Sequence, residues 1–231
     1  MQRIATTFLL SLALPFAAQA SGASEASTQQ VYTFAIELDA DGRLAGVTPH
    51  GSAPGASGAA LASEIRGWVF DAAAGSDASE TTRTFLRVVV DEAAAGGYRV
   101  VSATTGPALA NMAPPEYPVR DQLAGNEGMV VLRLQVGADG SVQDAEVHAA
   151  TGSVSRTMAD AARAASRQWS FSPEQVAGRA VASTLLWPVC YLGPSSPVSA
   201  CRWTGPDAQR FSSKTVLPLD PNVTVTWTAA R

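Results

Sequence analysis

The first ordered pattern in the chain is an alternation of large apolar and smaller or polar residues over positions 32–38. The large apolar positions are Tyr32, Phe34, Ile36 and Leu38. A period of two predicts a β-strand that buries one face. The sequence Asp-Ala-Asp-Gly at residues 39–42 predicts a tight turn, because Gly42 can adopt positive φ. We therefore expect a second strand at residues 43–48.

A similar pattern returns about a hundred positions later, over residues 130–136. Its apolar positions are Val130, Leu132, Leu134 and Val136. The sequence Gly-Ala-Asp-Gly at residues 137–140 again predicts a turn, and residues 141–148 read as the return strand. A glycine closes each pattern, at Gly51 and at Gly152.

A helix is expected after each strand pair. In the later copy the apolar positions have helical spacing, and the first copy carries a shorter version. The two stripes are Met158, Ala161, Ala162, Ala165 and Trp169, and Leu61, Ile65 and Trp68. Each helix ends in Trp-x-Phe. We interpret these aromatic residues as structural core at the helix exit, rather than as a ligand site; they are Trp68, Phe70, Trp169 and Phe171.

Each copy ends in a third strand, predicted at residues 82–91 and 181–192. Pro188 places the later strand at a sheet edge or a bulge, because proline cannot donate a ladder hydrogen bond. The pattern strand–strand–helix–strand therefore occurs twice. It predicts an α+β fold of two tandem small modules, at residues 31–91 and 112–192. An Ala- and Gly-rich linker at residues 92–111 would join them.

The N-terminus and the charge narrow the class of protein. Arg3, an apolar run and Ala-Gln-Ala at residues 18–20 predict a cleaved signal peptide at residues 1–20, followed by a polar stretch at 21–30. We expect a periplasmic protein; the alternative is an inner-membrane anchor if the signal is not cleaved. The 231 residues carry a net charge of -4, and no clustered basic face points to nucleic acid.

Candidate chemistry is sparse. An exported pair of cysteines predicts one disulfide between Cys190 and Cys201. The sequence contains no nucleophile-elbow, zinc-protease or phosphate-loop motif, and the two histidines, His50 and His148, read as strand-end residues. Asp39, Asp41 and Asp139 are interpreted as turn residues rather than calcium ligands. We therefore expect no catalytic residues, metal, cofactor or small-molecule substrate.

The later copy resembles the C-terminal domain of the TonB energy-transducer family. The matching features lie within residues 114–192: Tyr117-Pro118, Gly128, Asp139-Gly140, Gly152, a helix from Thr157, Trp169-x-Phe171-x-Pro173, Gly178 and Pro188. The resemblance implies helices packed on one face of a three-stranded antiparallel sheet. The first copy would be a degenerate relative, since it lacks the Tyr-Pro entry and the proline after the aromatic pair.

The resemblance also implies a partner. Members of this family bind outer-membrane transport receptors by taking a receptor segment as an extra strand. For this chain it implies that an outer-membrane receptor or other envelope protein pairs with the last strand. The expected edge residues are Val181, Ser183, Thr184, Leu185, Trp187, Pro188, Val189 and Tyr191. The expected entry segment contains Pro115, Tyr117 and Pro118.

Two features separate the chain from an anchored energy transducer: the signal looks cleavable, and no Pro-rich spacer follows it. The alternative function is a structural, self-associating envelope module without a peptide ligand. The tail at residues 193–231 lies outside the resemblance. Its alternating residues 221–227 could form one more strand, which would block the receiving edge if it paired there.

Overall fold

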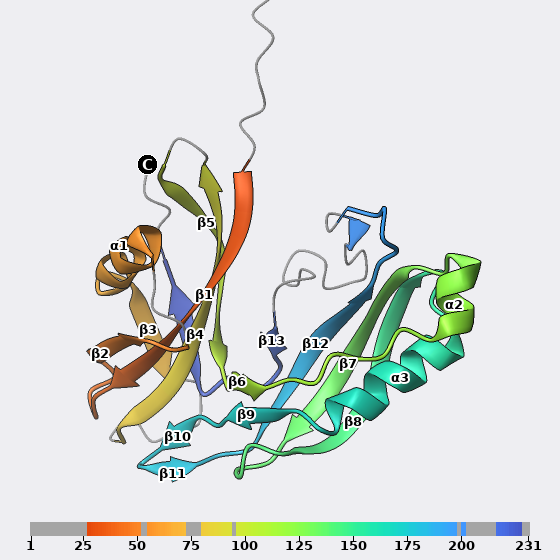
Figure 1. The fold of residues 1–231 in the computed structure, drawn as a ribbon. Helices are drawn as coiled ribbons and strands as arrows, with labels where there is room; N and C mark the ends of the chain where they lie inside the picture. Colours follow the sequence, from red (N-terminus) through yellow and green to blue (C-terminus); the bar gives the residue numbers. More distant parts are fainter. Residues whose placement is uncertain are drawn as a thin grey trace, which may run out of the picture.

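The computed structural model describes residues 27–51, 55–72, 80–93, 96–197, 200–201 and 216–227. The signal peptide expected at residues 1–20 lies outside these ranges. The described elements form mostly antiparallel sheets with few helices, which confirms the predicted α+β class (Figure 1). None of the helices in the described ranges is both long and apolar enough to cross a membrane.

The first half of the chain builds a sheet around its first strand. Its elements are β1 (Ser27–Leu38), β2 (Leu44–Pro49), α1 (Ala56–Ile65), β3 (Val69–Ala72) and β4 (Thr82–Ala93). The strand order is β4-β1-β2, and both pairings are antiparallel. Asp39 fixes the predicted turn, because its Oδ1 accepts hydrogen bonds from the backbone N–H groups of Asp41 and Arg43 at 3.0 and 2.8 Å.

The second half has the corresponding order β12-β7-β8. Its elements are α2 (Val119–Ala124), β7 (Gly128–Val136), β8 (Val142–Gly152), α3 (Arg156–Ser166), β9 (Ser170–Ser172), β10 (Gln175–Val176), β11 (Arg179–Ala180) and β12 (Ser183–Tyr191). Ser155 caps α3 by accepting the Met158 N–H at 3.2 Å. Both halves therefore pair their third long strand with their first; an origin by tandem duplication stays a prediction.

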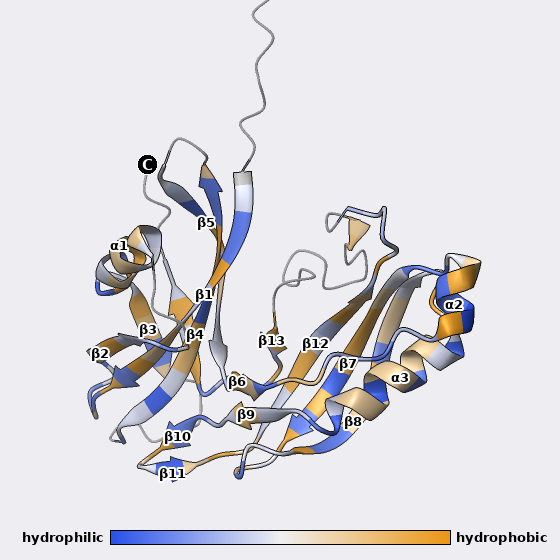
Figure 2. Cartoon of the chain, in the orientation of Figure 1, coloured by the Kyte–Doolittle hydropathy of each residue, from blue (hydrophilic) through white to orange (hydrophobic). Residues whose placement is uncertain are grey.

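Each half has its own core between its sheet and its long helix. In the second half, α3 lies on the sheet face that carries the alternating residues of β7 and β12, and hydrophobic positions concentrate in these strands (Figure 2). The fully buried members include Leu132, Leu134, Met158 and Leu185. The first half buries Phe34, Ile36, Leu61 and Ile65 in the same way.

The structure corrects the expected linker at residues 92–111. This segment is mostly strand: β4 continues to Ala93, and β5 (Tyr98–Gly106) and β6 (Ala108–Asn111) follow. β5 pairs with β4, from Phe85↔Gly106 to Glu92↔Tyr98, and so completes the outer edge of the first sheet. The polar stretch expected at residues 21–30 is also shorter, because Ser27–Gln30 already pair with β4 as the start of β1.

The two halves exchange short strands in both directions. After β5, the chain crosses to the second half, where β6 pairs with β9 and places Leu109 opposite Phe171. The tail forms β13 (Leu217–Pro218) on β12, and then β14 (Val223–Thr226), which pairs with β3 and places Val225 opposite Phe70. In addition, β10 pairs with the beginning of β4. The halves are thus joined by hydrogen-bonded strands, and not by a flexible connection.

Candidate functional site

The predicted receiving edge coincides largely with β12. Seven of the expected edge residues lie in this strand, and Val181 lies just before it, donating its N–H to the Glu174 carbonyl at 3.0 Å. The side chains of Leu185, Trp187, Val189 and Tyr191 are buried in the second-half core. They hold the strand in place and are not available to a partner. Any recognition at this edge must therefore use the β12 backbone and the opposite face.

The backbone at Thr184 points away from β7. Its carbonyl accepts the Leu219 N–H at 2.8 Å, and its N–H donates to the Asp220 Oδ1 at 2.8 Å. In an antiparallel ladder the N–H and C=O of one residue face the same side, and alternate residues face the same way. Pro188 has the same parity as Thr184. The nitrogen of Pro188 therefore faces the outer side of β12, so the absence of an N–H at this residue costs no hydrogen bond to β7.

The outer edge of β12 already holds a segment of the tail. β13 pairs Leu217 with Leu186 and Pro218 with Leu185. The tail strand expected at residues 221–227 does form, as β14, but it pairs with β3 in the other half. The residues just before it occupy the edge instead. Two neighbouring short strands of the tail thus serve two different sheets.

The predicted disulfide joins Cys190 near the end of β12 to Cys201, with a Cα–Cα distance of 6.1 Å. Cys201 is buried against the sheet face opposite α3. It packs there with Met129, Val131, Leu186 and Leu217. The bridge therefore fixes the start of the tail to the same strand on which β13 lies.

The expected entry segment packs at the far end of β12. The Tyr117 and Tyr191 rings are in edge contact, with centroids 5.2 Å apart, and the Tyr117 hydroxyl donates to the Asn126 carbonyl. Pro118 is the N-cap of α2, and Pro115 is half-buried before it. Burial, and secondarily the Asp121 carboxylate, raise the pKa of the Tyr191 hydroxyl to about 12. This segment braces the sheet end beyond the position of β13.

The repeated aromatic residues are buried in equivalent places. Trp169 and Phe171 both contact the Trp187 ring, at centroid distances of 5.4 and 5.6 Å, and the Trp169 Nε1–H donates to the Ala113 carbonyl at 2.8 Å. In the first half, Trp68 and Phe70 are 8% and 7% exposed. Trp68 packs on Trp227, with ring centroids 5.8 Å apart. These contacts tie the chain after α3 to β12 of the same half, and the chain after α1 to Trp227, the residue that follows β14.

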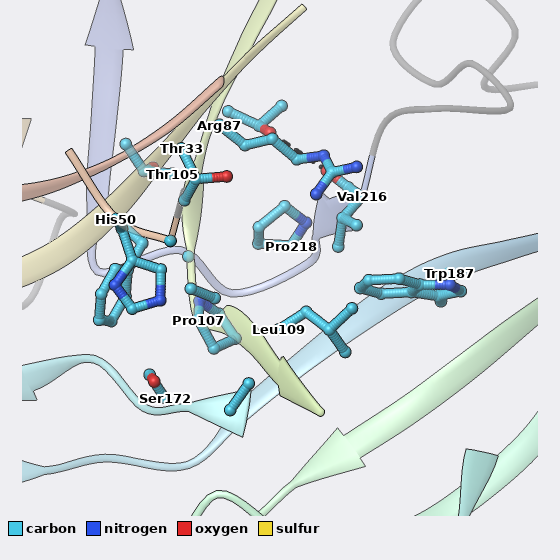
Figure 3. A pocket seen from close by; sticks show the side chains of 16 residues that line it. Thr33, His50, Arg87, Thr105, Pro107, Leu109, Ser172, Trp187, Val216 and Pro218 are labelled. Carbon is cyan, nitrogen blue, oxygen red and sulfur yellow. Dashed lines mark hydrogen bonds between the residues drawn. The ribbon is translucent and has the colours of Figure 1, made fainter. Parts of the chain in front are cut away.

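A pocket of about 480 Å³ lies where the two halves meet (Figure 3). Its lining includes Thr33, His50 and Arg87 from the first half, Trp187 from β12, and Pro218 from β13. The Arg87 guanidinium lies 6.0 Å from the centroid of the Trp187 ring, and burial lowers the pKa of this guanidinium. Sequence reasoning missed the pocket, because its residues come from segments far apart in the chain. Of the two histidines, His50 lines it, whereas His148 is exposed on β8.

Glu174 is a buried acid that no sequence pattern marked. Its carboxylate is 0% exposed and accepts hydrogen bonds from Thr84 at 2.6 Å, Asn222 at 2.9 Å and Ser183 at 3.4 Å. These three donors belong to β4, the tail and β12. Burial raises the pKa of the Glu174 carboxyl, against the opposing effect of its hydrogen bonds. In the described part of the chain, no three His, Cys, Asp or Glu residues gather as a possible metal site.

Comparison with known proteins supports the assignment for the second half. Residues 113–192 match the family model described as Gram-negative bacterial TonB protein C-terminal. The matched range runs from just after β6 to the residue after β12, and so contains the sheet β12-β7-β8 and α3. The first half lies outside the match. The chain has no significant match among curated proteins.

Proposed function

We propose, from the TonB C-terminal domain at residues 113–192, that this chain receives an extended segment of an outer-membrane receptor or other envelope protein as a strand on β12. The family is envelope-associated, and its domains are non-enzymatic parts of energy transducers. In this proposal the protein is exported and works in the periplasm. The partner strand takes the place of β13, and main-chain hydrogen bonds supply most of its affinity.

One difference between the two halves carries this proposal. The outer edge of β4 is closed along its length by β10 and the nine-residue β5. Among the residues that the structure describes, the outer edge of β12 pairs with two strand residues, Leu217 and Pro218, and Thr184 contacts Leu219 and Asp220. Each backbone hydrogen bond contributes about 1 kcal/mol net, so exchanging this short cover is a small, local step.

The exchange does not require the halves to separate. β14 is anchored independently of β13, because Val223 is fully buried in the first-half core and β14 pairs with β3 over four residues. Asn222 is held by Glu174 at 2.9 Å. We therefore expect the tail to detach over residues 216–221 while the crossing strand stays in place.

The test is direct binding of peptides from the periplasm-facing ends of outer-membrane receptors to the full-length chain and to its Asp220→Ala variant. Loss of the Asp220 acceptor weakens the resident segment, so the variant should bind a receptor peptide several-fold more tightly. Glu146→Gln, at an exposed position of β8, is the matched control for lost negative charge and should bind like the parent chain. Absence of binding by all three folded proteins would refute the proposal.

A structural, self-associating module is the second candidate, and the reciprocal crossings favour its structural role. β6 and β14 each complete the other half, so the chain satisfies internally much of the strand pairing that a partner could use. In that case the two halves form a rigid unit and β13 is permanent. Receptor peptides would then fail to bind whatever the state of Asp220.

A further inference from the structure

The segment seated on β12 shows what chemistry this edge accepts. Its side chains alternate in direction, as those of a bound strand do. Val216 packs into the core that contains Trp187, whereas Leu217 packs on the opposite sheet face with Met129, Val131 and Leu186. Both are 6% exposed. The edge therefore offers an apolar position on each face of the sheet, and two consecutive residues of an extended chain can fill them.

The backbone bonds of this segment fix where a proline is allowed. Leu219 donates its N–H to the Thr184 carbonyl at 2.8 Å, so Leu219 and Leu217 face β12 with their backbone groups. Pro218 stands between them, opposite Leu185, and its nitrogen faces away. A proline at this position loses no bond to β12. A proline one residue later would remove the donor to Thr184.

The acidic residue of the segment, Asp220, bonds to the one backbone donor of Thr184 that faces the edge. The Asp220 carboxylate accepts the outward-facing Thr184 N–H at 2.8 Å, in the place that a strand carbonyl would otherwise fill. A hydrogen bond from a backbone N–H to a carboxylate is stronger than one to a neutral acceptor. The side chain of Leu219, by contrast, is 44% exposed and points to no subsite.

We infer that the partner strand at β12 is an extended segment of defined pattern. It has two consecutive apolar residues, then a position that tolerates proline, then an unrestricted residue with a free N–H, and then an acidic side chain. The resident residues Val216–Asp220 are the chain's own copy of this pattern. This inference rests on the proposed function and specifies the partner that the β12 edge selects.

The experiment uses the full chain with its edge opened by one substitution. Leu219→Pro removes the N–H that bonds to Thr184, whereas Leu219→Ala removes the same exposed side chain and keeps the N–H. The probe is a labelled peptide of residues 215–222, Thr-Val-Leu-Pro-Leu-Asp-Pro-Asn, and binding is measured by fluorescence anisotropy. The peptide should bind the Leu219→Pro chain at least fivefold more tightly than the Leu219→Ala chain.

The same substitutions in the peptide should act in the opposite sense. On the opened chain, a peptide with Leu219→Pro should lose at least fivefold in affinity, one with Leu219→Ala should keep it, and one with Asp220→Asn should bind several-fold more weakly. Equal binding of the Leu219→Pro and parent peptides would overturn the register. Equal binding of the Asp220→Asn peptide would overturn the acidic position.

Receptor-derived peptides, measured in parallel, separate this inference from the function on which it rests. If they bind the opened chain and the tail peptide does not, the pattern is wrong while strand addition stands. If neither binds although the opened chain is folded, both fail. Should Leu219→Pro prevent folding, the Asp220→Ala chain takes its place with the same peptides and the same outcomes.

Discussion

The Glu174 carboxylate accepts a hydrogen bond from the Thr84 hydroxyl at 2.6 Å, and this contact joins the loop after β9 to the beginning of β4 in the other half. The same carboxylate holds Asn222 of the tail. Thr84 in turn accepts the Gly106 N–H at 3.2 Å, where the chain leaves β5. One buried acid therefore links both halves and both crossings.

This link makes the stability of the fold depend on pH. Burial raises the pKa of the Glu174 carboxyl. An acid with a raised pKa binds its proton more tightly in the folded chain, so its contribution to stability is full below the ordinary glutamate pKa of about 4.3 and is lost as the pH rises through the raised value. Glu174→Gln should remove this dependence, because the amide oxygen can still accept from Asn222 and Ser183 while the amide N–H₂ donates to Thr84.

The measurement is urea unfolding of the parent and Glu174→Gln chains at a series of pH values from 4 to 8. The difference in unfolding free energy should shift in favour of the variant as the pH rises. A difference that stays constant over this range would show that Glu174 does not titrate there.

Gly106 and Pro218 meet where the two crossings pass each other. Gly106 has a φ of +146°, and a Cβ placed on it would lie 2.6 Å from the Pro218 Cγ. Gly106→Ala should therefore destabilise the chain by about 1–3 kcal/mol and loosen β13. Gly42→Ala is the control: its φ is +76°, but no atom lies within 4 Å of the added Cβ, so only the backbone strain of about 1 kcal/mol applies.

Thermal unfolding compares the stability of the Gly106→Ala and Gly42→Ala chains, and peptide binding by the Gly106→Ala chain should increase. Unchanged peptide binding by a destabilised Gly106→Ala chain would mean that Pro218 does not control access to the edge.

The two equivalent tryptophans should differ when each is replaced by phenylalanine. Trp169→Phe leaves the Ala113 carbonyl without its donor, which adds about 1–3 kcal/mol to the loss of packing. The Trp68 Nε1 has no hydrogen-bond partner among the described residues, so Trp68→Phe should cost mainly packing. Chemical denaturation of both variants tests this order, and a larger loss for Trp68→Phe would contradict it.

Local patterns predicted much of each half. Alternation at residues 32–38 and 130–136, the Asp-Gly turns and the helical stripe that ends in Trp169 depend on neighbours a few positions away, and the elements formed there. The disulfide was predicted because the chain has a single pair of cysteines, which would be oxidised in the exported protein that we expect. These features are readable because their physical causes lie within one short segment.

The strands that cross between the halves could not be predicted from the sequence, because their pairing depends on residues far away in the chain. β5 and β6 lie in a stretch that is rich in Ala and Gly, and the partner of β6, the strand β9, is far away in the chain. β13 has two residues, one of them proline, and carries no periodic signal. For β14, alternation indicated a strand but could not choose between the edges of β12 and β3. The burial of Glu174 likewise follows from the crossings, and nothing near it in sequence marks it.

Exchange at the β12 edge is tested most directly by fixing β13 in place. Leu219 follows Pro218, which pairs with Leu185, and donates its N–H to the Thr184 carbonyl at 2.8 Å, so Leu219 lies opposite Thr184. Residues opposite each other in an antiparallel arrangement are about 4.5–5.5 Å apart at their Cα atoms, a separation that a disulfide can span. The Thr184→Cys/Leu219→Cys chain, with both bridges verified by mass spectrometry, should bind receptor peptides at least tenfold more weakly than the single Leu219→Cys chain with its thiol blocked. Equal binding by the locked and unlocked chains would contradict the account, because the partner would then use a surface other than the edge that β13 covers.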